Sequence, residues 1–421
     1  MKFAFALMGS RGDVQPALPV ALELRRRGHD VAVGVAPNLI PLAQRLGLCP
    51  RPVGLDSRAL LSSDTVRQHK SSRNPRTWVR AHQAMATYGW TEFRTGVTDL
   101  SERLGGADAI VVGLLGQEVG SAVAEALGCG FAALHYFPVR PNGVVPLVPR
   151  VGPRLQRAAG EAVLGLRWAL TRRGENEQRC ALGLPPAVVP LQKRLRDRGA
   201  VEVQAYDPLL VPGLPSEWGV HRPFVGFLAL SATEREMVGE ADAGDGDLAE
   251  WLDAGDPPVY VGFGSMPVRD PSALLASVSG ACADLGLRAL VSAGWNAFDG
   301  VGPEADHVKI VGPVDHAAVL PRCRAAVHHG GAGTTGAVLR AGIPSVIGWY
   351  SADQPLWGRL LERAGVGTSH RAAMLDRATL REALAEVLCP TVVTRSAAIS
   401  RELIGPEAAV QAAADAVEMA G

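Results

Sequence analysis

The stretch KFAFALMGSRGDVQPALPVALELRRRGHDVAVGVA, residues 2–36, contains two apolar runs separated by a polar turn and an amphipathic segment. Residues 2–8 predict a fully buried strand, and residues 30–36 predict a second one. Between them, residues 16–27 place leucine and alanine at helical spacing, and Gly28 ends the helix. A strand, a helix and a strand in this order form a parallel pair with a right-handed crossover. This stretch therefore predicts an α/β fold.

The same order of segments recurs along the rest of the chain. Further apolar strands are predicted at residues 109–113, 131–135, 258–263, 288–292, 308–311, 325–328 and 345–347. A chain of 421 residues exceeds one hydrophobic core, so we expect two domains. The predicted architecture is two Rossmann-like, doubly wound domains that face each other across a cleft.

The domain boundary is expected where Pro and Gly are dense, in the segment 206–226. This predicts an N-terminal domain over residues 1–210, a linker over residues 211–230 and a C-terminal domain over residues 231–421. The last helix, about residues 407–419, is a candidate to pack back on the N-terminal domain.

The charge of the chain is balanced, with 42 basic and 42 acidic residues, so it does not favour nucleic acid as a partner. Residues 140–198 carry eleven arginines and one lysine against four acids. This segment predicts either solvated faces or a basic surface that meets a membrane. Residues 2–8 are too short for the apolar core of a secretory signal. No run approaches the ~20 apolar residues of a membrane span.

The six cysteines lie far apart and show no zinc-binding spacing. We expect them to be reduced, buried thiols of a cytoplasmic protein. This expectation argues against an extracellular adhesion role for the tripeptide Arg11-Gly12-Asp13.

The segment VHHGGAGTTG, residues 327–336, places a glycine-rich turn between a strand and a helix that begins near Thr334. Backbone amides at such a helix start bind phosphate oxygens, and the hydroxyls of Thr334 and Thr335 add donors. His329 adds a donor for a second phosphate. The alternative is a tight turn whose glycines only allow close packing.

About twenty residues later, Asp353-Gln354-Pro355 places a carboxylate beside an amide. Each of these side chains can bridge two neighbouring hydroxyls of a sugar. The alternative is a turn in which the proline opens a helix at Leu356. A second acidic motif, Asp245-Gly246-Asp247, is either a divalent metal site or an acidic loop that caps the next helix.

Taken together, these motifs resemble the GT-B glycosyltransferases that use UDP- or TDP-sugars, in particular the bacterial antibiotic enzymes and the sterol glucosyltransferases. The matching segments, in the family order, are GSRGDVQP, VYVGFGSM, SAGW, VGPVDHAAVLPRC, HHGGAGTT and DQPLWGRLLERAGVG. They extend over nearly the whole chain.

The resemblance implies a role for each matched residue. Asp13 corresponds to the catalytic base in the first-strand turn. The residues implied in binding the donor diphosphate are Ser10, Gly264, Ser265, His329, Gly331, Ala332, Gly333 and Thr334. Trp295 and the backbone around Val314 are implied in holding the nucleotide base, and Asp353 and Gln354 in contacting the donor sugar.

Two segments depart from the family pattern. Many relatives carry a histidine as the base in the first turn, where this chain has only Asp13, so we group it with members that use aspartate. Trp349-Tyr350-Ser351-Ala352 stands where relatives commonly have Pro-Phe-Phe-Gly. That segment borders the sugar, so the identity of the sugar stays open.

The acceptor is expected to contact aromatic and histidine side chains of the N-terminal domain. The candidates are Trp78, His82, Tyr88 and His135. Such rings suit a flat or apolar acceptor. Core packing of helices explains Trp78 and Tyr88 equally well.

The reaction that the resemblance implies is inverting transfer of a hexose or deoxyhexose to a hydroxyl of a hydrophobic small molecule, with Asp13 as base. A helix N-cap is the alternative role for Asp13. We expect no cofactor and no metal, and a monomer or homodimer without nucleic acid or a transmembrane segment. Two other functions stay open: a non-catalytic nucleotide-binding partner of another glycosyltransferase, and a nucleotide-sugar epimerase.

Overall fold

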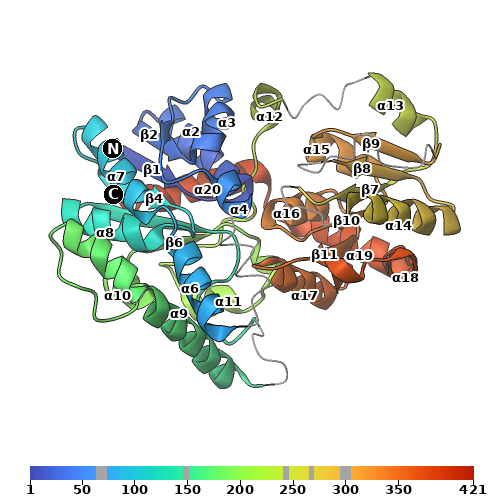
Figure 1. Cartoon of the computed structure of the whole chain (residues 1–421). Coiled ribbons are helices and arrows are strands. Elements are labelled where there is room, and N and C mark those ends of the chain that lie inside the picture. The colour runs from blue at the N-terminus through green and yellow to red at the C-terminus, as the bar shows by residue number, and fades with distance from the viewer. Residues whose placement is uncertain (63–73, 146–150, 240–245, 265–269, 294–304) are drawn as a thin grey trace. The chain divides into compact units, whose positions relative to one another are not determined.

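The computed structural model describes residues 1–62, 74–145, 151–239, 246–264, 270–293 and 305–421. The chain divides into two compact units (Figure 1). One consists of Met1–Leu230 with Gly405–Gly421, and the other of Ser231–Ile404. Residues 211–230, expected as a linker, thus belong to the first unit.

The first unit is built on a six-stranded parallel sheet with the order β3-β2-β1-β4-β5-β6. Its strands are β1 (Lys2–Leu7), β2 (Asp30–Val35), β3 (Arg51–Pro52), β4 (Ala109–Val112), β5 (Gly130–His135) and β6 (Val201–Gln204). Its helices are α1 (Arg11–Val14), η1 (Gln15–Ala17), α2 (Leu18–Arg26), η2 (Pro37–Leu39), α3 (Ile40–Arg45), α4 (Ser57–Ser62), α6 (Pro75–Ala86), α7 (Trp90–Arg103), α8 (Gln117–Leu127), α9 (Pro153–Ala181), α10 (Leu191–Asp197), η3 (Pro208–Leu210), α11 (Leu214–Trp218) and α20 (Pro406–Glu418).

The C-terminal helix α20 packs against α2 of the first unit, and Figure 1 shows it, in red, among the blue N-terminal elements. Arg27 donates to Asp415 over 2.6 Å and to Glu418 over 3.0 Å, and the His29 ring lies 2.7 Å from Glu418. These contacts join the two ends of the chain within one unit.

The second unit repeats the plan with the sheet order β12-β11-β10-β7-β8-β9. Its strands are β7 (Val259–Gly262), β8 (Ala289–Ser292), β9 (Val308–Val311), β10 (Ala325–His328), β11 (Ser345–Trp349) and β12 (Gly367–Arg371). Its helices are α12 (Ala232–Met237), α13 (Gly246–Asp253), α14 (Pro271–Asp284), α15 (His316–Val319), η5 (Leu320–Arg322), α16 (Ala332–Arg340), α17 (Gln354–Ala364), η6 (Ala372–Met374), α18 (Arg377–Val387) and α19 (Pro390–Glu402).

Both faces of the second sheet are buried, as a doubly wound sheet requires. Val259, Val261 and Phe263 contribute to a core on one face, whereas Tyr260 and Leu290 contribute to a core on the other. This explains why the strands are apolar almost without interruption. The predicted fold class, two Rossmann-like doubly wound sheets, is confirmed.

The strand orders define where ligands are expected in each unit. In the first sheet the order reverses between β1 and β4, and in the second between β7 and β10. Ligands of such folds bind outside the carboxyl ends of the strands at this reversal. The turn at Gly9–Asp13 follows β1, and the glycine-rich turn at residues 329–331 follows β10.

All six cysteines are free, but their expected burial is only partly right. Cys282 and Cys323 are buried and Cys129 is half-buried. Cys49, Cys180 and Cys389 are exposed, so the expectation of buried thiols is wrong for these three.

Among the described residues, no single helix is long and apolar enough to cross a membrane. The pair α18 and α19 reaches that length and composition together, with a bend of 66° at the junction. Four side chains of α18 belong to the core of the second unit: Leu380, Ala383, Leu384 and Val387.

Candidate active site

The first turn of the chain holds Asp13 through its own helix start. Ser10 is the N-cap of α1, and both its amide and its hydroxyl donate to Asp13 Oδ2, over 2.7 and 2.8 Å. Asp13 thus stands at the third helical position, as in a capping box, and not at the N-cap. The alternative role of Asp13 as an N-cap is corrected accordingly, because the cap is the preceding serine.

The Asp13 carboxyl is half-buried beneath the turn. Burial raises its pKa above the usual aspartate value, and the two hydrogen bonds from Ser10 oppose that shift. A raised pKa makes the carboxylate a stronger base than a free aspartate. The environment of the turn therefore shifts Asp13 in the direction that a general base requires.

Two residues that the sequence did not single out hold Asp13 in place. The Tyr136 hydroxyl, just after β5, donates to the Asp13 carbonyl over 3.0 Å. Gly9 has a φ of +121°, and a Cβ there would lie 2.5 Å from Asp13 Oδ2. Glycine is thus required for the close approach of this backbone to the carboxylate.

In the second unit, the glycine-rich turn leads into α16, which begins at Ala332 with Gly331 as its N-cap. The first amides of an α-helix have no acceptor within the helix, so those of Ala332, Gly333 and Thr334 are suited to an anion. Thr334 is half-buried and Gly333 is exposed. The helix begins two residues earlier than the sequence predicted.

His329 packs between two glycines at the ends of β7 and β10. A Cβ on Gly331 would come within 2.5 Å of His329 Nε2, and a Cβ on Gly264 within 3.3 Å of its Cε1. Larger residues at these positions would displace the imidazole. The structure thus brings Gly264, His329 and Gly331 together, as the resemblance implies.

The His329 ring is neutral near pH 7. Burial lowers its pKa to about 4, nearby His316 adds to the shift, and the backbone of Gly262 opposes it. Its Nδ1 is buried and has no hydrogen-bond partner in the described part of the chain. A buried ring nitrogen without a partner is costly, and a bound ligand can relieve that cost.

The second sugar-site candidate, Gln354, opens α17 and is nearly fully buried. Its Oε1 accepts the amide of Tyr350 over 2.8 Å and that of Ser351 over 3.3 Å. The carbonyl end therefore holds the preceding turn, and the amide nitrogen is the end suited to a ligand. Asp353 is the half-buried N-cap residue of the same helix.

Comparison with known proteins identifies the family. Residues 281–417 match the model of the erythromycin biosynthesis protein CIII-like, C-terminal domain. An uncharacterized glycosyltransferase of Mycobacterium tuberculosis is 43% identical over 420 residues, which are 99% of this chain and 98% of the relative. The chain belongs to the GT-B glycosyltransferases.

Two further proteins are similar to this glycosyltransferase. The vancomycin aglycone glucosyltransferase of Amycolatopsis orientalis is 31% identical, over 98% of this chain and 96% of the relative. The crystal structure of the glycosyltransferase VinC in complex with dTDP has a TM-score of 0.65 and 19% identity, and it covers 100% of this chain and 99% of its own. The sequence likeness to the vancomycin aglycone glucosyltransferase shows the family. The structural likeness to VinC shows the fold alone.

The acceptor candidates of this glycosyltransferase are placed differently from one another. His135 is fully buried, and its ring nitrogens lie 3.4 Å from both Gln117 and Gln204. Burial lowers its pKa to about 3, so the ring is a neutral part of a buried polar network. Tyr88 is half-buried against the core of the first unit. Trp78 and His82 belong to α6, but their side chains lie outside what the structure describes.

The residues implied in holding the nucleotide base are only partly described. Val314 is buried in the core beside α15, so only its backbone is suited to a base. Trp295 and Ser265 lie outside the described residues.

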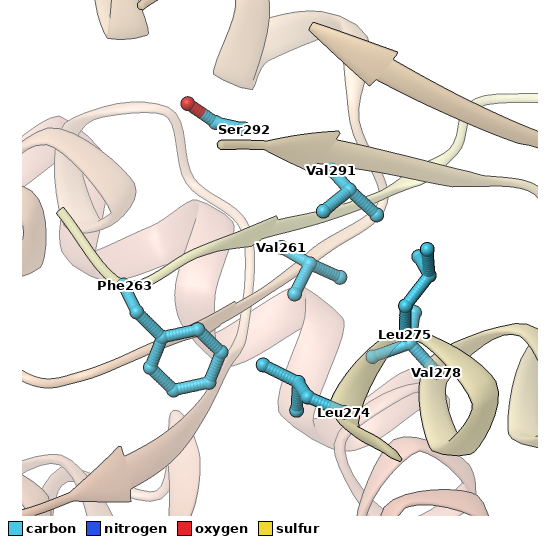
Figure 2. Close-up of a pocket in the computed structure, with 7 residues that line it drawn as sticks. All are labelled: Val261, Phe263, Leu274, Leu275, Val278, Val291 and Ser292. Atoms are coloured by element: carbon cyan, nitrogen blue, oxygen red, sulfur yellow. The ribbon is translucent and has the colours of Figure 1, made fainter. Parts of the chain in front are cut away.

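Figure 2 shows a pocket at the ends of β7 and β8, lined by Val261, Phe263, Leu274, Leu275, Val278, Val291 and Ser292. Its lining is apolar except for Ser292, and most of it belongs to the core, so we assign it to packing.

The acidic motif and the basic segment both form ion pairs. Asp247 pairs with Lys309, and Asp245 lies outside the described residues. Where the structure describes the chain, it groups no three His, Cys, Asp or Glu residues that could hold a metal ion.

Most arginines of the basic segment, residues 140–198, pair with acids: Arg140 with Glu202, Arg157 with Glu217, Arg167 with Glu118, Arg179 and Arg198 with Glu125, and Arg194 with Glu175.

Ala352, just before Asp353, has a φ of +61° and is the one residue other than glycine with positive φ among the described residues. The left-handed region costs an L-residue roughly 1–2 kcal/mol. The substitution Ala352→Gly is therefore expected to stabilise the second unit by about 1 kcal/mol, which raises its melting temperature by roughly 2–4 °C.

Differential scanning calorimetry measures this shift, with Ala385→Gly as the matched control. Ala385 is exposed within α18, where the same change is expected to destabilise by about 1 kcal/mol. Equal destabilisation by both substitutions would show that Ala352 is not strained.

Proposed function

We propose that the protein is an inverting glycosyltransferase that moves a hexose or deoxyhexose from a UDP- or TDP-sugar to a hydroxyl of a hydrophobic small molecule. The observation that carries the donor half is the turn at β10. There His329, whose buried Nδ1 has no hydrogen-bond partner in the described part of the chain, lies beside Gly331, the N-cap of α16. A nucleoside diphosphate supplies the acceptors that these donors lack.

In the proposed reaction, the Asp13 carboxylate takes the proton from the acceptor hydroxyl. The oxygen then forms a bond to the anomeric carbon, and the bond from that carbon to the diphosphate oxygen breaks. The electron pair leaves with the nucleoside diphosphate, whose charge is stabilised by the α16 amides and His329. Attack from the face opposite the leaving group inverts the anomeric configuration. No cofactor takes part.

The acceptor and donor classes rest on the relatives. The vancomycin aglycone glucosyltransferase acts on a natural-product aglycone, as its name states, and VinC was crystallised with dTDP. Free cysteines, three of them exposed, agree with the proposed cytoplasmic location. The fully buried His135 is the weakest of the proposed acceptor contacts.

Asp353→Ala is expected to impair use of the sugar, with little change in affinity for the free nucleoside diphosphate. The reason is that the proposed contact of Asp353 is to sugar hydroxyls and not to phosphate. Calorimetric titration with UDP, TDP and the matching nucleotide sugars measures both. An equal loss for the free nucleotide would place Asp353 elsewhere in the donor site.

Activity is expected to survive excess EDTA, because helix amides and His329 take the part that a divalent cation plays elsewhere. A steady-state rate measured with and without EDTA checks this. Loss of activity that Mg²⁺ or Mn²⁺ restores would contradict the proposal and return attention to Asp245 and Asp247.

A thermal-shift panel of UDP- and TDP-sugars tests the donor class. A ligand that binds only the native state raises its melting temperature, and the stabilisation grows with the logarithm of ligand concentration over Kd. Stabilisation by one nucleotide series is expected, and stabilisation by neither would contradict the proposed donor.

A further inference from the structure

His328, the residue before His329, is fully buried at the end of β10. Its Nδ1 accepts the amide hydrogen of Gly330 over 3.2 Å, so that nitrogen carries no proton. Its Nε2 must then carry the proton, and it lies 3.2 Å from the Ser345 hydroxyl. The two contacts select one neutral tautomer of the ring. Burial lowers its pKa to about 3, so that tautomer persists at neutral pH.

Gly330 makes the tightest bend of the turn. Its φ is +85°, and a Cβ there would lie 2.8 Å from Ile347 Cγ2 and 3.3 Å from the Gln354 carbonyl. The Gly330 amide points toward the fully buried His328 ring, whose other nitrogen faces Ser345 of β11, so it is directed into the protein. The amides that follow, from Ala332 to Thr334, begin α16 and have no acceptor within it.

We propose that His328 is a positioning residue for the diphosphate turn: by holding the Gly330 amide inward, it sets the direction in which the first amides of α16 and His329 meet the ligand. The inference rests on the proposed function of that turn. His328 is fully buried and touches no ligand itself. Its effect on binding passes through the backbone of Gly330 and Gly331 to the first amides of α16.

The physical cost of losing this contact is an unsatisfied buried donor. Without an acceptor at residue 328, the Gly330 amide either stays unpaired or turns to find water. The second outcome rotates the turn and moves the first amides of α16 away from the position at which they bind the diphosphate. The first outcome lowers the stability of the unit, whereas the second weakens phosphate binding, and the second is the one we expect.

Two substitutions separate the hydrogen bond from the shape of the ring. His328→Phe keeps a planar ring and removes both contacts. His328→Asn keeps an oxygen that can accept the amide two residues on, as in an Asx turn. The matched control is His370→Phe on β12 of the same sheet, where Nε2 makes no hydrogen bond in the described structure.

Calorimetric titration with TDP and UDP, together with hydrogen exchange of the Gly330 amide, tests the inference. H328F is expected to weaken nucleotide binding by about tenfold, the loss that one unsatisfied donor produces, and to speed Gly330 exchange. H328N is expected to bind within a few-fold of wild type and H370F to bind as wild type does.

Wild-type affinity in a folded H328F variant, or a loss in H328N equal to that in H328F, would overturn the positioning role. A wild-type protein that binds neither nucleotide would instead overturn the proposed donor. In that case slow Gly330 exchange in wild type and H328N, and fast exchange in H328F, still supports His328 as the residue that sets the turn. Equal exchange in all three overturns it.

Discussion

Asp13→Asn is expected to lower kcat by at least about 10²-fold, the lower end of general-base contributions. Asparagine is nearly isosteric, and its side-chain oxygen can still accept the Ser10 amide that Asp13 now holds. The folded turn should therefore persist, while the group that accepts the proton is gone. Steady-state kinetics with a saturating donor measures the loss.

The pH profile separates a base from a structural carboxylate. Since burial raises the Asp13 pKa, the active, unprotonated form is gained as the pH rises through a value above the usual aspartate range. The acid limb of kcat/KM should lie there in wild type and be absent from D13N. For stability the sign is opposite: a raised pKa favours the folded state at low pH, and this contribution is lost as the pH rises through that pKa.

Asp108→Asn is the matched control for this substitution. Asp108 also accepts a backbone amide, that of Lys2 over 2.7 Å, but it precedes β4 and so lies at the amino end of the sheet. Wild-type activity is expected for D108N. A fully active D13N would leave Asp13 a structural residue of the helix start, and the base would have to be sought at His82 or in the substrate.

His329→Ala is expected to lower kcat/KM by about 10²–10³-fold, as the loss of one donor to a developing anion does elsewhere. The variant should fold, because residue 329 is only half-buried and its Nδ1 makes no hydrogen bond to lose in the described structure. The imidazole is neutral without ligand, since burial lowers its pKa to about 4. A bound diphosphate raises that pKa, so nucleotide affinity should increase toward acid pH in wild type and not in H329A.

The control for His329 is a residue of the same kind in the same unit. His370→Ala removes an imidazole from β12, which lies two strands from β10 in the sheet order. It is expected to leave kcat and nucleotide affinity unchanged. If folded H329A keeps the kcat and kcat/KM of wild type, the assignment of the diphosphate turn is wrong.

The sequence predicted those strands whose residues are apolar on both faces, because their burial leaves a continuous pattern. It missed β3, whose two residues are exposed. It also missed β6 and β12, whose buried positions include Glu202, Gln204 and Thr368. The charge of Glu202 is matched by Arg140 and Arg222, which come from distant parts of the chain. A local pattern contains no information on such partners.

The candidate site shows the same limit. Motif spacing predicted Asp13, His329 and Gly331, which the structure places at the strand ends. It did not predict Tyr136 or His328, because their contacts depend on which backbone groups the fold brings to them. The strain at Ala352 is likewise invisible without a backbone angle.

The central claim is that this chain transfers a sugar from a nucleotide to an acceptor hydroxyl. The most direct test follows nucleoside diphosphate release from UDP- and TDP-sugars, with and without a panel of hydrophobic hydroxylated acceptors. The mass of the acceptor after the reaction is measured by mass spectrometry. Release that requires an acceptor, with one hexose or deoxyhexose added to it and with loss of both in D13N, is the predicted result. Tight binding of the nucleotide sugar with no transfer to any acceptor would contradict it and favour a non-catalytic partner. Conversion of the free nucleotide sugar without an acceptor would favour an epimerase.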